Sequence, residues 1–302
     1  MIQYLALLLA LALGALPGFA ADAWSPTKWQ NTPAWQSRSG GWLAVVSESR
    51  ARLIYLGPAE GRVNLLYAPP APAPLRPRGG HIAWLGPQAE WYGGREVWPP
   101  PGGWESAGSA SVSSSGDTLT MVLPRVANLP VLSRSYFWKD RALHCQVAWS
   151  GGKGSYQVIQ IVQLPPQAMV TARPGGASGG GFIRISVDGR NRRESPAGSP
   201  EIAMRADGAV QIRSREGRAK FGFPPQPLRA VIGRYSLVME RGETLGRVLD
   251  SPDAGFDTQV YVGGKVHPFV EIEQLSPRLK NAGKAENAFT VILKPGMRDF
   301  LP

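Results

Sequence analysis

Short alternations of apolar and polar residues dominate the chain. Leu119, Met121 and Leu123 alternate with threonines, and the same two-residue period recurs at 143–149 and 183–187. This is the period of a strand with one buried face. No long stretch keeps the 3.6-residue apolar period of a helix without an interrupting Gly or Pro. The pattern therefore predicts an all-β protein with short helical turns at most.

Turn residues predict two β-hairpins. The first joins 202–206 to 209–213 across an Asp-Gly pair, and the second joins 258–262 to the chain from Lys265 onward across a Gly-Gly pair. Such pairs favour the tight turns that connect neighbouring antiparallel strands. Neighbouring strand patterns thus predict antiparallel sheets.

One segment, 157–164 (QVIQIVQL), is apolar on both faces, as expected of a strand that is covered on both sides. Two segments are expected to be surface loops. The segment 68–78 is too rich in proline to pair inside a sheet, and 172–181 is too rich in glycine to pack. No internal repeat is visible and the strand patterns continue on both sides of these loops, so residues 22–302 are expected to form a single domain.

The first residues predict export. Residues 1–21 begin with an uncharged apolar run (MIQYLALLLALALGALPGFA) that is followed by small residues, which is typical of a secretory signal peptide. Its Leu- and Ala-rich part is much shorter than the roughly 20 residues that a membrane-spanning helix needs. We expect a periplasmic or secreted protein without a membrane span after cleavage, with an uncleaved anchor as the alternative.

The composition limits which cofactors and partners the protein can have. Cys145 is the only cysteine and there are three histidines, which excludes an internal disulfide and any multi-cysteine metal site. No metal or organic cofactor is expected. The 33 Lys and Arg against 22 Asp and Glu give a net charge of +11, which attracts anionic partners such as uronic-acid polymers. The alternative is that this charge serves solubility alone. No nucleic-acid-binding motif is present.

Four stretches, taken in order, resemble the galactose-mutarotase-like superfamily and, within it, a secreted bacterial branch of unknown function. Residues 41–68 resemble the opening hairpin of that superfamily, and 79–88 (GGHIAWLGPQ) resemble the stretch that follows it. Residues 133–164 are similar to its two long central strands, and 269–277 (FVEIEQLSP) are similar to its late strand with the catalytic glutamate. The resemblance implies a β-supersandwich, a carbohydrate ligand and aldose 1-epimerase-like mutarotation.

Glu271 and Glu273 are the strongest candidate site residues. They lie two positions apart in an apolar strand, so both carboxylates leave the same face while Val270 and Ile272 leave the other. Adjacent carboxylates are costly unless water, cations or a ligand receives them, and close pairing raises the pKa of one of them. The resemblance implies that Glu273 is the catalytic base. The alternative is a solvent-facing strand paired with arginine.

The resemblance also suggests a candidate general acid, and the chain departs from the superfamily's pattern at one position. His81 lies in a glycine-rich turn and is the candidate acid, although it could equally bond a nearby carbonyl. His267 shares the parity of the two glutamates and is a reserve candidate. Where mutarotases carry a second histidine on a central strand, this chain has Gln163, which can bond sugar hydroxyls but cannot relay a proton.

Aromatic and basic residues complete the candidate substrate-binding set. Tryptophans and a tyrosine crowd into 84–104, and Trp84 is the candidate for stacking on a sugar ring. The alternative is that these rings cap one end of the sandwich. Arg134 and Lys220 are candidates for binding an anionic sugar, each with an ordinary surface charge as the alternative.

We therefore expect a monomeric, exported carbohydrate-binding protein that uses general acid/base chemistry for mutarotation. The main alternative is a non-enzymatic envelope module that binds anionic polysaccharide through a basic surface. A third hypothesis, a lyase acting on uronic acids, requires a Tyr or His base beside an Arg or Lys, and the sequence displays no compact motif of that kind.

Overall fold

The computed structural model describes residues 21–69, 79–87, 102–104, 110–152, 154–175, 181–187, 193–250 and 255–293. Within these ranges the regular structure consists of strands β1 to β23 and one 3₁₀ turn, η2 (Gly102–Trp104). All paired strands run antiparallel; two examples are the ladders β8–β9 and β10–β21. The prediction of an all-β fold is therefore confirmed.

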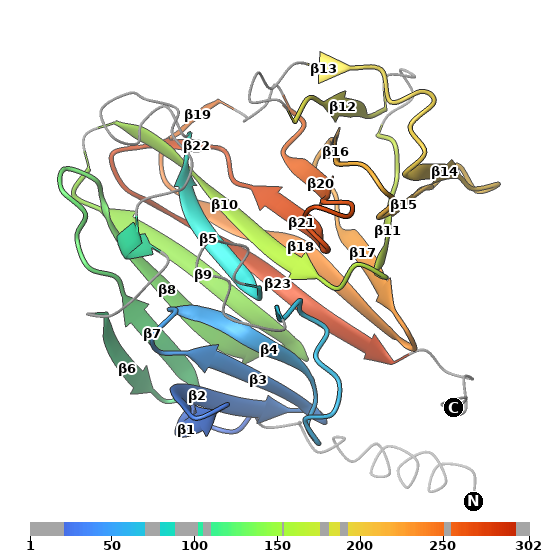
Figure 1. Ribbon diagram of the computed structural model, residues 1–302. Helices are drawn as coiled ribbons and strands as arrows, with labels where there is room; N and C mark the ends of the chain where they lie inside the picture. The colour runs from blue at the N-terminus through green and yellow to red at the C-terminus, as the bar shows by residue number, and fades with distance from the viewer. Residues whose placement is uncertain are drawn as a thin grey trace, which may run out of the picture.

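A ten-stranded sheet forms the back layer in Figure 1. Its longest members are β18 and β23, which pair along most of their length with one irregularity between Arg241 and Thr244. In spatial order its strands are β14 (Ile202–Met204), β15 (Val210–Arg213), β11 (Met169–Ala172), β17 (Leu228–Ile232), β18 (Tyr235–Leu245), β23 (Gly283–Leu293), β9 (Ala142–Ser150), β8 (Val131–Lys139), β7 (Thr118–Val122) and β6 (Ser111–Ser115).

A nine-stranded sheet lies in front of it (Figure 1). Strand β10 is central, because it pairs with β21 on one side and with β5 on the other. In spatial order the strands are β13 (Arg193–Glu194), β12 (Ile183–Ile185), β16 (Ala219–Phe223), β20 (Thr258–Val262), β21 (Val270–Leu275), β10 (Ser155–Leu164), β22 (Arg278–Lys280) and β19 (Val248–Asp250), with β5 (His81–Gly86) beside β10.

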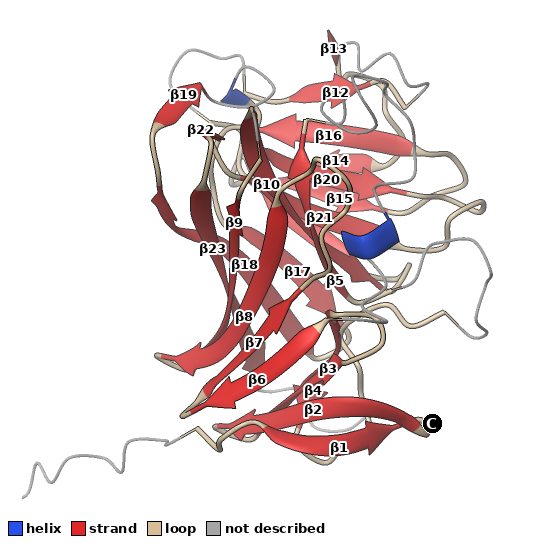
Figure 2. Cartoon of the chain, turned by 90° about the vertical axis from the view of Figure 1, so that its left-hand side faces the viewer, coloured by secondary structure: helices blue, strands red, loops and turns tan. Residues whose placement is uncertain are grey.

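A four-stranded meander forms the N-terminal part of the described chain. Its strands follow one another in sequence order, with tight connections between neighbours. They are β1 (Ser25–Trp29), β2 (Thr32–Ser39), β3 (Trp42–Ser47) and β4 (Arg52–Pro58). Figure 2 shows this sheet at one end of the molecule, below β6 to β8.

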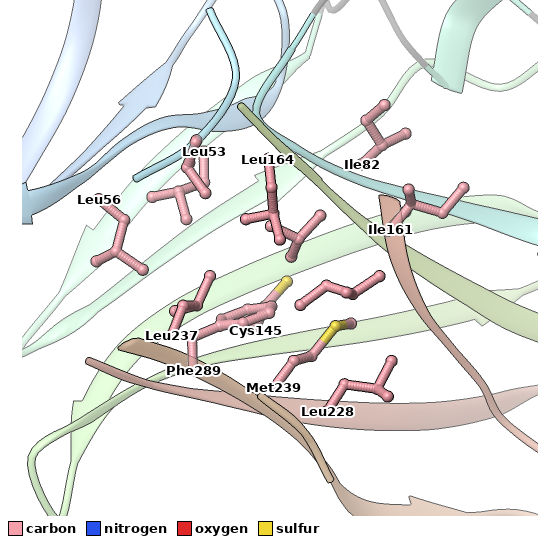
Figure 3. Packing of buried hydrophobic residues seen from close by; sticks show 14 of the residues in the cluster. Leu53, Leu56, Ile82, Cys145, Ile161, Leu164, Leu228, Leu237, Met239 and Phe289 are labelled. Atoms are coloured by element: carbon pink, nitrogen blue, oxygen red, sulfur yellow. The ribbon is translucent and has the colours of Figure 1, made fainter. Parts of the chain in front are cut away.

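The core lies between the two large sheets. Val260 and Ile272 from the nine-stranded sheet, and Leu143 and Met239 from the ten-stranded sheet, are all fully buried in one continuous cluster. Figure 3 shows residues of this cluster from both layers pointing toward one another. Burying one such side chain contributes about 1.5–3 kcal/mol, so the alternation read from the sequence supplies most of the driving force for this packing.

The two predicted hairpins have different outcomes. The first is confirmed, since β14 pairs with β15. For the second, the predicted connection is wrong, because β20 pairs with a strand that begins at Val270 and not at Lys265. The backbone N–H of Lys265 donates to the carbonyl of Glu216 at 3.2 Å, and Pro268 has no N–H to offer a ladder. The chain therefore forms a longer connection before the next strand begins at Val270.

Arg134 lies inside the protein and not on its surface. Its side chain is 1% exposed and its guanidinium donates to the carbonyls of Ala51, Ala83 and Trp104, the last two at 2.7 and 2.5 Å. Three segments that are distant in sequence are thereby tied to β8. Arg134 is consequently a structural residue, and it cannot reach a ligand on the surface.

We expect the substitution Arg134→Met to lower the free energy of unfolding by about 3 kcal/mol or more, because buried carbonyls lose their donors. Urea denaturation of the purified protein measures this change. The exposed Arg38, changed to Met, is the matched control and should shift stability by no more than about 0.5 kcal/mol. Equal effects of the two substitutions would contradict the structural role.

Candidate functional site on the nine-stranded sheet

A row of polar side chains crosses the nine-stranded sheet. Residues that face each other in antiparallel ladders share a face of the sheet. Gln163 on β10 faces Glu271 on β21, Glu271 faces Tyr261 on β20, and Tyr261 faces Lys220 on β16. These four side chains lie on the face that points away from the ten-stranded sheet, which we call the outer face. The intervening residues, Val270 among them, fill the core.

Glu273 lies one row further along the same face, between Ile161 and Gln259. It is 4% exposed, and Lys220 Nζ donates to its Oε2 at 3.0 Å. The side chains of this ion pair are 25% and 5% exposed for Lys220 and Glu273 respectively. Water screens such a pair less than it screens a surface pair, so the ammonium holds the carboxylate in a defined position.

Gln163 is fixed at both ends of its amide. Its Nε2 donates to Glu271 Oε1 at 2.8 Å, and its Oε1 accepts from the backbone N–H of Gly79, also at 2.8 Å. Gly79 has a φ of 72°, which favours glycine, and a Cβ there would meet the carbonyl of Tyr67. The glycine-rich turn before β5 therefore orients Gln163, which in turn orients Glu271.

Glu271 has an unusual proton affinity. Burial raises the pKa of its carboxyl to about 7, and the neighbouring Glu273 carboxylate contributes to this rise. The hydrogen bond from Gln163 and the charge of Lys220 oppose it. At neutral pH the group is accordingly present in both protonation states, which suits a carboxyl that donates or accepts a proton.

Tyr261 and His267 form a second polar pair beside Glu271. The Tyr261 hydroxyl and His267 Nδ1 lie 2.9 Å apart. Burial, then the charge of Glu271, raises the pKa of Tyr261 to about 12, while burial and then Arg218 lower the pKa of His267. Both groups are therefore neutral at pH 7 and exchange a hydrogen bond without carrying charge.

His81 faces the core, on the opposite side of the sheet from Glu273. It is 0% exposed, its Nε2 lies 3.0 Å from Gln160 Oε1, and its ring packs edge-on against Phe289. Burial, then the charge of Arg134, lowers the pKa of His81 to about 3. This neutral, enclosed imidazole cannot act as the acid partner of Glu273.

Trp84 shares the outer face with Glu273 and is buried to a similar extent. It faces Ile159 across the ladder between β5 and β10, and it is 5% exposed. Trp104 is buried, and its backbone carbonyl accepts a hydrogen bond from Arg134. The other aromatic residues of the crowded stretch, Trp91, Tyr92 and Trp98, lie outside the described residues.

The structure thus brings together Glu273, Glu271, Gln163 and Lys220 and separates His81 and Arg134 from them. Tyr261 joins this group although the sequence pattern did not single it out. The signal was available in its parity with Glu271 across the hairpin, but this parity is hidden when the returning strand is placed at Lys265 instead of Val270.

Neither a metal centre nor a membrane-spanning helix is found in the ranges described above. Among those residues, no three His, Cys, Asp or Glu side chains are grouped as a metal ion would require. The same part of the chain contains no helix of the length and hydropathy that crossing a membrane demands.

Comparison with known proteins supports the fold assignment. No family model matches the chain, and no curated protein matches it significantly. Solved structures do match over nearly their whole length. A galactose mutarotase-like protein from Lactobacillus casei is 11% identical, with a TM-score of 0.57 and coverage of 86% of this chain and 99% of that one. Galactose 1-epimerase from Lactobacillus acidophilus is 10% identical, with a TM-score of 0.52 and coverage of 91% and 99%.

A galactose mutarotase-related enzyme from Lactobacillus acidophilus is 8% identical, with a TM-score of 0.56 and coverage of 88% of this chain and 100% of that one. At these identities the likeness establishes the fold alone. The protein has the galactose-mutarotase-like β-sandwich architecture, as the sequence resemblance predicts. The names of these neighbours describe mutarotase- and epimerase-like proteins.

The raised pKa of Glu271 has a consequence for stability. Between the ordinary glutamate pKa of 4.5 and about 7, the native state keeps a proton that the unfolded state releases, so the free energy of unfolding falls as pH rises through this window. Each pKa unit corresponds to about 1.4 kcal/mol, and partial exposure reduces the total to about 2 kcal/mol.

We therefore expect Glu271→Gln to stabilise the protein by up to about 2 kcal/mol at about pH 8 and to change little at about pH 5, because glutamine carries no charge to bury. Urea denaturation at both pH values measures the difference. The exposed Glu240, changed to Gln, is the control and should show no such pH dependence. A gain that is independent of pH would contradict the assignment.

Proposed function

We propose that this protein binds a carbohydrate on the outer face of the nine-stranded sheet and catalyses aldose 1-epimerase-like mutarotation. The observation that carries the proposal is the carboxyl pair Glu271 and Glu273. The two groups differ in environment: Lys220 pairs with Glu273, and burial raises the pKa of Glu271 to about 7. General acid/base catalysis requires one group that donates a proton and one that accepts it, and two neighbouring carboxyls in different environments suit this division.

Mutarotation requires a base for the anomeric hydroxyl and an acid for the ring oxygen, so that the ring opens and closes again. We assign the base to Glu273, whose Oε2 accepts a hydrogen bond from Lys220 Nζ. We assign the acid to Glu271, which carries its proton for a large fraction of the time near pH 7. After rotation about the C1–C2 bond, ring closure returns one proton from Glu273 to the carbonyl oxygen and the other from the C5 hydroxyl to Glu271, so the pair is restored in each cycle.

The neighbouring groups position the carboxyls and the sugar. Gln163 orients Glu271 by its 2.8 Å hydrogen bond, and Lys220 does the same for Glu273. Tyr261 and His267 extend the polar row and present neutral donors and acceptors to sugar hydroxyls. No metal or organic cofactor is needed for these steps.

A second candidate function is a non-enzymatic module that binds anionic polysaccharide. It is favoured by Gln163 at the position where the resemblance calls for a second histidine, and by the net charge of +11. Binding of this kind is sensitive to salt and does not depend on the carboxyl pair. The two candidates therefore differ in their response to substitution of Glu273.

Elimination on a uronic acid is less well supported. The fold does assemble Tyr261, His267 and Arg218, a set that the sequence alone does not display. However, the pKa of Tyr261 is raised to about 12, which leaves almost no phenolate to act as a base near pH 7. We therefore propose mutarotation in preference to elimination.

We also propose that the protein is exported, on the basis of the apolar segment at 1–21.

Replacing the proposed base tests the function directly. We expect Glu273→Gln to lower the rate of anomer exchange by about 10²- to 10⁴-fold while sugar binding is kept, because only proton transfer is lost. Polarimetry, or NMR exchange between anomers, measures the rate against a panel of hexoses. Glu286→Gln is the matched control, since Glu286 is also paired, with His144 at 2.7 Å, but lies in the other sheet. An unchanged rate in Glu273→Gln would refute the site, and salt-sensitive binding without turnover would favour the module.

The pH profile tests the acid. We expect the rate to fall as pH rises through about 7, because the protonated form of Glu271 is lost there. In Glu271→Gln the remaining rate should be low and should no longer fall in this range. A wild-type rate that still climbs above pH 7 would contradict the assignment of Glu271.

A further inference from the structure

A groove of about 470 Å³ lies beside the carboxyl site, along the N-terminal sheet. The end of β1, the turn before β4 and the segment that follows β4 line most of it. Its lining includes three aromatic and two basic side chains: Trp29, Tyr55 and Tyr67 together with Arg50 and Arg62. This volume is within the range of sites that hold small organic ligands.

The groove and the carboxyl site share a wall. Gly79 lines the groove, and its N–H donates to Gln163 Oε1 on the other side of this wall. Gln163 in turn donates to Glu271. Tyr67, also in the groove, packs its ring 5.5 Å from that of Phe269, directly before β21. The groove is therefore connected to Glu271 through Gly79 and Gln163.

The aromatic side of the groove suits a sugar ring. The rings of Trp29 and Tyr55 lie 4.8 Å apart, and Tyr55 is buried with its hydroxyl bonded to the carbonyl of Pro58. Tyr55 thus supports Trp29, which lines the groove and remains partly exposed. Apolar C–H faces of sugars pack on such rings.

The basic side of the groove calls for an anion. Arg62 is exposed and Arg50 is partly exposed, and neither takes part in an ion pair within the part of the chain that the structure describes. No described residue lining the groove is acidic. Guanidinium groups bind carboxylates through two parallel hydrogen bonds, which a neutral sugar cannot accept.

We propose that this groove is a subsite for a uronic acid residue adjacent to the sugar held at Glu271 and Glu273, so that the natural ligand is a carboxylate-bearing oligosaccharide. This inference rests on the proposed function for the position of the first sugar. Trp29 stacks on the uronate ring, and Arg50 and Arg62 pair with its carboxylate.

Calorimetric titration of the protein with a galacturonate trisaccharide, the uncharged galactose trisaccharide and a panel of hexoses tests the subsite. We expect the double substitution Arg50→Gln and Arg62→Gln to weaken binding of the charged trisaccharide by about tenfold at low salt. Hexose affinity should not change. The exposed pair Arg38→Gln and Arg247→Gln removes the same charge outside the groove and should leave every affinity within about twofold.

The substitution Trp29→Ala separates stacking from charge. It should weaken both trisaccharides and spare the hexoses, because it removes the ring face that either chain would use. Equal weakening of the charged trisaccharide by both arginine pairs would overturn the subsite, since only general charge would then matter. An unchanged affinity in the groove variants would overturn it as well.

The two proposals can fail separately. If hexoses bind but the groove substitutions leave trisaccharide binding unchanged, the subsite is refuted and the proposed function stands. If no hexose binds, while binding of the charged trisaccharide depends on Arg50 and Arg62, the groove is supported and the proposed function is contradicted. If none of the saccharides binds, both are overturned.

Discussion

The two-residue period of strand β10 is the constraint on which the rest of the structure depends. Gln160 and Val162 point toward the ten-stranded sheet, where Gln160 bonds His81 and approaches the carbonyl of Cys145. Gln163 points the other way and bonds Glu271. Because a strand alternates strictly, a shift of one residue would send the core residues outward and the polar residues inward. The pairing of β10 with β21 and β5 therefore builds the core and the polar row in the same step.

Charge is arranged differently on the two sides of this sheet. In the interior, Arg134 is held by backbone carbonyls, and its charge helps to keep His81 neutral. On the outer face, Glu273 has Lys220 as a partner, whereas Glu271 has the neutral Gln163 amide. Burial disfavours the charged form of Glu271, and the Gln163 hydrogen bond and the Lys220 charge offset this effect only in part, so the pKa of Glu271 is raised. Two chemically identical carboxyls thus have different partners, and this difference underlies the proposed division into a base and an acid.

Much of the fold was readable as alternation. Strand patterns at 118–123 and 143–149 correspond to β7 and β9, and the apolar 157–164 lies inside β10. The parity of Glu271 and Glu273 correctly placed both carboxyls on one face. The return of the second hairpin was misplaced, because the connection is longer than a two-residue turn and Lys265 donates to the distant residue Glu216 instead of to β20.

What the sequence by itself determined is local: the all-β class, the face that each strand residue occupies and the carboxyl pair, since these follow from the geometry of single strands. Only the tertiary structure decided which faces became core and which polar residues met. In the tertiary structure His81 and Arg134 lie in the core. Lys220 and Tyr261 lie beside the two glutamates, because strand pairing joins residues that are separated by many positions in the chain. The sequence of one strand does not determine which strands pair with it, and the candidate site combines side chains from several paired strands.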